Sequence, residues 1–150
     1  RGEDYIYNMQ RLLQKFATAK ALVPQPVVEQ SERPPSPQAA IFYGSTSPAM
    51  AEAVEHLRED GIVLDTLRVR AFPFPDSIHE FIRAHDSVFV VEQNRDGQLR
   101  SLLINEFGID PARLIAVLHY DGTPITARFI ARSITGRIAA QRQPLRKEVA

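Results

Sequence analysis

Two short polar segments hold most of the residues in this chain that could do chemistry. The first stands between a predicted strand and a predicted helix, where free backbone N–H groups and hydroxyls could hold a phosphate or a carboxylate. This candidate anion-binding loop consists of Gly44, Ser45, Thr46 and Ser47. It lacks the spaced glycines of a dinucleotide fingerprint and the lysine of a P-loop. The alternative is that Ser47 simply caps the following helix.

The second segment, Glu92 to Gln98, concentrates charged and amide side chains directly after an apolar run. A carboxylate beside an arginine could form an acid–base pair, but catalysis also needs a partner group and a pocket. The segment could also be a hydrogen-bonded turn in which Glu92 or Asp96 caps the next helix. We favour a third interpretation, an interface element, because arginine is enriched at protein contacts. The interface candidates, with one residue from a later turn, are Glu92, Asn94, Arg95, Asp96, Gln98 and Asp121.

The rest of the chain yields no catalytic residue and no metal ligand. Its 4 histidines are scattered over different predicted elements, and no two have the spacing of a shared metal site. We expect them at the surface or at helix ends. There is no Gly-x-Ser-x-Gly elbow, and spacing assigns no histidine to Ser45 or Ser47. A small hydrolase that uses Ser45 or Glu92 is therefore the least favoured hypothesis.

The elements that must position these residues alternate between apolar runs and helical patterns. The predicted strands are Ala39–Tyr43, Ile62–Val69, Ser87–Val91 and Leu114–Leu118, and the predicted helices begin at Pro48, at a capping box of Ser77 with Glu80, near Leu99, and near Pro124 or Ile125. The apolar run Ser87–Val91 is continuous, which predicts a central strand buried on both faces. This alternation predicts an α/β fold, a three-layer sandwich with a mostly parallel sheet. Ligands and partners of such sheets gather at the carboxyl ends of the strands.

The chain divides into four predicted segments. Residues 1–23 form an amphipathic helix, and residues 24–37 form a proline-rich linker. Residues 38–139 form the α/β domain, and residues 140–150 form a basic tail. The first residue is Arg1 and not methionine, so we expect the chain to be part of something longer.

Composition excludes several classes of protein. The 150 residues include no cysteine, which excludes disulfides and thiolate metal sites and favours the cytoplasm. The 18 basic and 18 acidic residues balance, so we expect neither nucleic acid nor a membrane surface as a partner. No apolar segment reaches the roughly 20 residues that a membrane-spanning helix needs.

Three segments together resemble a known family: Ile41 to Thr46, Val90 to Arg100, and His119 to Thr126. They are similar to the C-terminal part of the alpha subunit of 2-oxoacid:ferredoxin oxidoreductases, most like the 2-oxoglutarate type. The similarity extends to the first helix and its exit at Leu22-Val23-Pro24. The resemblance implies a fold like the C-terminal domain of transketolase.

The resemblance also implies an activity for the whole assembly. Such an enzyme decarboxylates 2-oxoglutarate with thiamine diphosphate, passes electrons through a [4Fe–4S] cluster to ferredoxin, and forms succinyl-CoA. In the family, thiamine diphosphate, magnesium and the cluster are held by other polypeptide, so none is expected on this segment. The implied partners are the rest of the alpha subunit, the beta subunit and ferredoxin. Two alternatives stay open: a stand-alone module that binds an anion or effector, and the same domain in an oxidoreductase for pyruvate or another 2-oxoacid.

Overall fold

A five-stranded mixed sheet forms the centre of the computed structural model, which describes residues 2–31 and 36–142. The strands lie in the order β1 (Val27–Glu29), β3 (Asp65–Val69), β2 (Gln38–Tyr43), β4 (Ser87–Glu92) and β5 (Leu114–Leu118). Strand β1 pairs antiparallel with β3, and every other pair in the sheet is parallel. The predicted mostly parallel α/β fold is confirmed.

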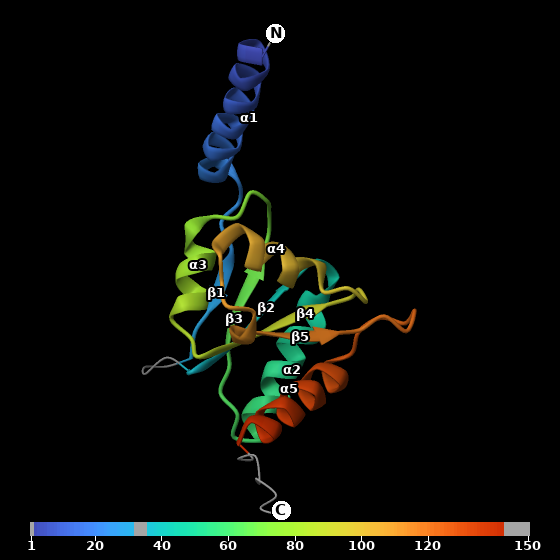
Figure 1. Cartoon of the computed structure of the whole chain (residues 1–150). Helices are drawn as coiled ribbons and strands as arrows, with labels where there is room; N and C mark the ends of the chain where they lie inside the picture. Colours follow the sequence, from blue (N-terminus) through green and yellow to red (C-terminus); the bar gives the residue numbers. More distant parts are fainter. Residues whose placement is uncertain (1, 32–35, 143–150) are drawn as a thin grey trace, which may run out of the picture.

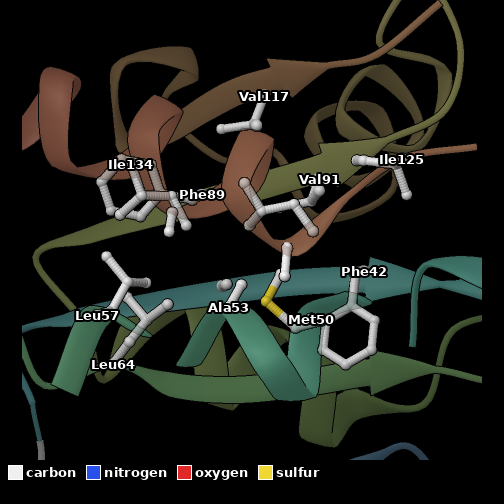
Figure 2. Close-up of a cluster of buried hydrophobic side chains, with 14 of the residues drawn as sticks. Phe42, Met50, Ala53, Leu57, Leu64, Phe89, Val91, Val117, Ile125 and Ile134 are labelled. Atoms are coloured by element: carbon white, nitrogen blue, oxygen red, sulfur yellow. The ribbon is translucent and has the colours of Figure 1, made fainter. Parts of the chain in front are cut away.

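Two pairs of helices cover the two faces of the sheet and complete the three layers (Figure 1). Helices α2 (Ser47–Glu59) and α5 (Ala127–Arg142) lie on one face, and α3 (Asp76–Arg83) and α4 (Gln98–Phe107) lie on the other. A core between the sheet and α2 and α5 contains Phe42, Met50, Phe89 and Ile134 (Figure 2). Apolar burial of this kind is the dominant favourable term in folding.

Strand β4 explains the continuous apolar run in its sequence. Phe89 and Val91 belong to the core beneath α2 and α5, and Val88 and Val90 belong to the core beneath α3 and α4. All six residues of β4 are buried, as predicted. The middle position of the sheet belongs to β2, whereas β4 is an interior strand between β2 and β5.

The first helix, α1 (Gly2–Leu22), projects from the body of the molecule (Figure 1). None of its residues is buried. Near its C-terminal end, the ring of Phe16 packs edge-on against Phe72, with 6.3 Å between the ring centroids. Lys20 forms an ion pair with Asp76 at the start of α3. These contacts connect one end of α1 to the loop that follows β3.

Several predicted boundaries were wrong. The segment predicted as a linker contains strand β1, and its residues 32–35 lie outside the described residues. The second strand begins at Asp65 and not at Ile62, and α5 begins at Ala127 and not near Pro124 or Ile125. Because α5 continues through residue 142, the start of the predicted tail is helical, and residues 143–150 lie outside the described residues.

Two predicted helix caps were also wrong. The expected capping box of Ser77 and Glu80 does not form, because the N-cap of α3 is Pro75 and the Ser77 hydroxyl lies 3.5 Å from the side-chain oxygen of Gln25. Ser47 is the first residue of α2, and its hydroxyl donates to the carbonyl of Gly44 at 3.2 Å. It therefore closes the preceding turn and does not cap the helix.

Among the described residues, no helix combines the length and apolar character that crossing a bilayer requires.

Candidate site at the carboxyl edge of the sheet

The two polar segments singled out in the sequence lie next to each other at the carboxyl ends of β2 and β4. These strands are neighbours in the sheet. The connection after β2 leads to β3, toward one edge of the sheet, whereas the connection after β4 leads to β5, toward the other edge. Such a switch point is where open α/β sheets bind ligands. The side-chain amide of Gln93 donates to the hydroxyls of Ser45 at 3.1 Å and Thr46 at 3.2 Å. Gln93 thus joins the two loops.

The candidate anion-binding loop is mostly engaged within the chain. Gly44–Thr46 forms a short 3-10 turn that leads directly into α2. The hydroxyls of Ser45 and Thr46 accept from Gln93, Thr46 is buried, and the Ser47 hydroxyl donates to Gly44. Binding of an anion by Gly44, Ser45, Thr46 and Ser47 stays a prediction.

Glu92 is the one interface candidate whose side chain cannot reach a partner. It is fully buried at the end of β4. Its carboxylate accepts hydrogen bonds from the backbone N–H groups of Leu99 at 2.7 Å and Arg100 at 3.0 Å, and from the side-chain amide of Asn94 at 2.8 Å. The expectation that Glu92 offers contact surface is therefore wrong, and the alternative that it serves the N-terminus of the next helix is correct. The same burial removes Glu92 as an acid or base for a hydrolase.

The other residues of this segment build the turn around that carboxylate. The side-chain oxygen of Asn94 accepts from the backbone N–H groups of Asp96 at 3.1 Å and Gln98 at 3.2 Å. Gly97 has a φ of 61°, in the left-handed region that favours glycine, and it precedes the first residue of α4. Arg95 and Asp96 form an exposed ion pair at 2.7 Å. Arg95, Asp96 and Gln98 are exposed, and their role at an interface stays a prediction.

Asp121 lies in the loop after β5 and is also exposed. Hydrogen bonds from the hydroxyl and the backbone N–H of Thr123, at 2.7 and 2.8 Å, lower the pKa of its carboxyl group. The Nε2 atom of His119 lies 3.5 Å from the same carboxylate oxygen. His119 itself is buried, in contrast to the expected surface position. Asp121 keeps the exposure that an interface residue needs, and that role stays a prediction.

A third polar cluster, not predicted from the sequence, lies near the amino ends of the strands. Asp65 and His85 are fully buried, with 3.1 Å between Oδ2 of Asp65 and Nε2 of His85. The other ring nitrogen of His85 lies 2.7 Å from the carbonyl of Phe81. The ring thus connects the side chain of Asp65 with the backbone at the end of α3. The cluster is a buried, hydrogen-bonded pair of Asp65 and His85.

The surroundings of Asp65 favour its charged form. Burial by itself raises the pKa of a carboxyl group. Hydrogen bonds from the backbone N–H and hydroxyl of Ser31, at 2.8 and 2.7 Å, together with the bond and charge of His85, outweigh burial and lower the pKa of Asp65. Because Ser31 follows β1, Asp65 holds the edge strand and its exit against the sheet. The signal in the sequence was weak, since a single aspartate inside an apolar run is also compatible with an exposed position.

The residues do not fit a metal cluster. The chain has no cysteine to supply thiolate ligands. Among the described residues, no group of three or more histidine, aspartate or glutamate side chains could hold a metal ion. In the described part of the chain, the histidines have separate partners: His56 faces Glu52, His79 stacks on Phe107, His85 bonds to Asp65 and His119 faces Asp121.

A family model described as pyruvate:ferredoxin oxidoreductase core domain II matches residues 38–126, which is more than half of the chain. The chain belongs to this family. The match begins at β2 and ends just before α5, so it includes all three loops with the candidate residues.

Two curated relatives of the family are alpha subunits. The "2-oxoacid:ferredoxin oxidoreductase 2, subunit alpha" of Aeropyrum pernix is 32% identical over 98 residues, which cover 64% of this chain and 15% of the relative. The "2-oxoacid:ferredoxin oxidoreductase subunit alpha" of Saccharolobus solfataricus is 29% identical over 119 residues, which cover 77% of this chain and 18% of the relative. The chain thus spans less than a fifth of the length of these relatives.

Solved structures share the fold of this member of the family. The 2-oxoglutarate:ferredoxin oxidoreductase of Magnetococcus marinus, solved with 2-oxoglutarate, coenzyme A and succinyl-CoA bound, matches with a TM-score of 0.79 at 21% identity, over 92% of this chain and 24% of that chain. A split-gene transketolase matches with a TM-score of 0.62 at 17% identity, over 79% of this chain and 42% of that chain. The alpha chain of a probable 2-oxoacid ferredoxin oxidoreductase from Thermoplasma acidophilum matches with a TM-score of 0.52 at 23% identity, over 77% of this chain and 97% of that chain.

Proposed function

We propose that this chain is a structural and contact domain at the C-terminal end of the alpha subunit of a thiamine-diphosphate-dependent 2-oxoglutarate:ferredoxin oxidoreductase. The assembly would convert 2-oxoglutarate and CoA to succinyl-CoA and CO2, with electrons passed to ferredoxin. The family match over residues 38–126 supports the place in an alpha subunit. The similarity to the Magnetococcus marinus enzyme supports 2-oxoglutarate as the substrate class.

The hydrogen bonding at the carboxyl edge of the sheet is the observation that supports the proposed role as a contact domain. The carboxylate that could have acted as a catalytic base, Glu92, is buried and bonded to backbone N–H groups. The hydroxyl of Ser45 accepts from Gln93. The charged side chains that remain exposed at this edge, Arg95, Asp96 and Asp121, are suited to contacts across a polar interface.

The cofactors would then lie in other polypeptide. Thiamine diphosphate supplies the chemistry that stabilises the carbanion formed on decarboxylation, and an iron–sulfur cluster supplies one-electron transfer. A chain without cysteine cannot ligate such a cluster through thiolates. We propose that thiamine diphosphate, magnesium and the [4Fe–4S] cluster are bound outside this chain. The proposed partners are the rest of the alpha subunit, the beta subunit and ferredoxin, and the proposed location is the cytoplasm.

Purification of the tagged chain from its own host tests the proposal. We expect oxidoreductase subunits and the visible absorption of an iron–sulfur cluster to accompany the tag. We also expect CoA-dependent reduction of ferredoxin to be faster with 2-oxoglutarate than with pyruvate. Faster reduction with pyruvate would contradict the substrate assignment, and a tag that brings down neither cluster nor oxidoreductase subunits would contradict the proposal as a whole.

A further inference from the structure

Helix α1 carries an apolar stripe along one side that the described part of the chain does not bury. The stripe, called the α1 stripe below, consists of Tyr5, Ile6, Met9, Leu12, Leu13 and Phe16. These residues recur at the spacing of one helical face. Their exposed fractions run from 42% for Met9 to 69% for Tyr5. Apolar side chains of this size, placed together on one face, mark an interaction surface.

Packing contacts within the described part of the chain do not cover the apolar face of α1. Most helical stability in proteins comes from tertiary packing of an amphipathic face and not from helix propensity. With 21 residues and no buried side chain, α1 has its packing contacts at its C-terminal end, through Phe16 and Lys20. Its N-terminal half, with Tyr5, Ile6 and Met9, needs an apolar partner.

The α1 stripe continues onto the body of the molecule. The ring of Phe16 packs on Phe72, which is itself 46% exposed. Phe72 also lines a crevice of about 430 Å³ at the carboxyl edge, between the ends of β2 and β3 and the first turns of α4. Tyr43 and Leu102 line the same crevice and are partly exposed. A partner that follows the α1 stripe toward the body would therefore reach this crevice.

We propose that the α1 stripe and the crevice beside Phe72 form one docking surface for an apolar segment of the remaining alpha-subunit polypeptide. This inference rests on the proposed function. The relatives are alpha subunits of which this chain spans less than a fifth, so such subunits contain abundant further polypeptide. The family model begins at residue 38, after α1, which places α1 outside the body of the matched domain.

The match to a larger solved chain also reaches the N-terminal segment. The match to the Magnetococcus marinus enzyme covers 92% of this chain, which is more than the residues after 36 could provide, so it extends into the N-terminal segment. The matched part is 24% of that chain. A body with this fold therefore occurs, in that neighbour, within a polypeptide several times larger.

Photo-cross-linking in the native host tests the docking surface. A photoreactive amino acid is placed at Leu13 in the α1 stripe, at Gln14 on the polar side of α1, and at Arg95 in the loop after β4. Cross-linked peptides are identified by mass spectrometry. We expect the Leu13 position to cross-link apolar residues of alpha-subunit polypeptide and the Gln14 position to cross-link little of it, since only the Leu13 position lies in the α1 stripe.

The outcomes separate this inference from the proposed function. Equal cross-linking from Leu13 and Gln14, or cross-links from Leu13 to a second copy of this chain, would overturn the docking surface. Cross-links to oxidoreductase subunits from Arg95 but not from Leu13 would overturn it while the proposed function stands. No cross-link to an oxidoreductase subunit from any position would overturn the proposed function as well.

A charge variant adds an independent readout. Leu13→Glu should reduce the oxidoreductase polypeptide that co-purifies with the chain by about tenfold, because it places a charge in the contact. Gln14→Glu adds the same charge outside the α1 stripe and should leave the yield unchanged. Neither change should shift the melting temperature of the isolated chain, since neither side chain is buried. Equal losses of co-purification in both variants would overturn the proposal.

Discussion

At the scale of single residues, Glu92 has a structural role, although its residue type and position suggested a chemical one. It ends a buried strand, and its carboxylate bonds to two backbone N–H groups in the first turn of α4. The first N–H groups of a helix have no partner within the helix, and a negative charge there also interacts favourably with the helix dipole. Glu92 therefore fixes the position of α4 relative to β4.

Replacement of Glu92 by glutamine should destabilise the chain. The amide retains the size of the side chain but turns a donor toward one of the N–H groups that the carboxylate satisfies. We expect a loss of about 1–3 kcal/mol in the free energy of unfolding, measured by urea denaturation. Asp96→Asn removes the same charge from an exposed position in the same loop and should change stability by less than about 0.5 kcal/mol. A similar loss in both variants would contradict the role assigned to Glu92.

The pair of Asp65 and His85 predicts how stability depends on pH. The pKa of Asp65 in the folded chain lies below its ordinary value of 3.8. The stabilisation is therefore complete above the ordinary pKa and is lost as the pH falls through the lowered pKa. Asp65→Asn should cost about 1–3 kcal/mol at pH 7, because the amide cannot accept all the hydrogen bonds that the buried carboxylate accepts. The difference from the wild-type chain should narrow below pH 3.8 in denaturation curves recorded at several pH values. A constant difference over that range would argue against a charged Asp65.

Residue types predicted where the polar loops lie better than they predicted the hydrogen bonds of each residue. The polar run after Val91 forms a loop that Asn94 organises. The buried position of Glu92 could have been inferred from its place at the end of a continuous apolar run. The role of Gln93 was missed because its side-chain amide bonds to Ser45, which lies 48 positions away in the sequence. A contact over that separation leaves no local sequence pattern.

At the scale of elements, hydrophobic periodicity predicted those strands and helices whose apolar side chains are buried in the core. The strands β2, β4 and β5 and helix α4 lie close to where their apolar patterns placed them. Strand β1 was missed because three exposed residues within a proline-rich segment have no hydrophobic pattern. The predictions of the caps of α2 and α3 were wrong for a similar reason. A serine near the start of a helix forms whichever hydrogen bond the tertiary structure offers.

The attachment of α1 to the body predicts local dynamics. Its C-terminal end contacts the body through Phe16 on Phe72 and through Lys20 on Asp76. Phe72→Ala removes the aromatic contact while Lys20 can still pair. We expect faster amide hydrogen exchange in residues 12–22 of the variant, with little change in α4, because exchange reports local opening. Leu102→Ala is a matched control at the same crevice, away from Phe16. Unchanged exchange in α1 of the Phe72 variant would show that this contact does not hold the helix.

At the scale of the whole molecule, the alternation of strands and helices was sufficient to predict the fold class. A mostly parallel sheet with helices on both faces follows from short connections and right-handed crossovers. The edge position and antiparallel direction of β1 could not be predicted, because they depend on long-range contacts such as Ser31 with Asp65. Function is less accessible than fold, since related folds host many activities.

The central claim is that this chain contributes contact surface while neighbouring polypeptide performs the chemistry. Cryo-electron microscopy of the assembly purified through a tag on this chain tests it most directly. We expect the α1 stripe and the carboxyl-edge loops to lie within contacts that bury more than about 1,000 Å² in total, as specific interfaces do. We also expect thiamine diphosphate and the iron–sulfur cluster to be bound by other polypeptide. A smaller buried area, or thiamine diphosphate held by side chains of this chain, would contradict the account.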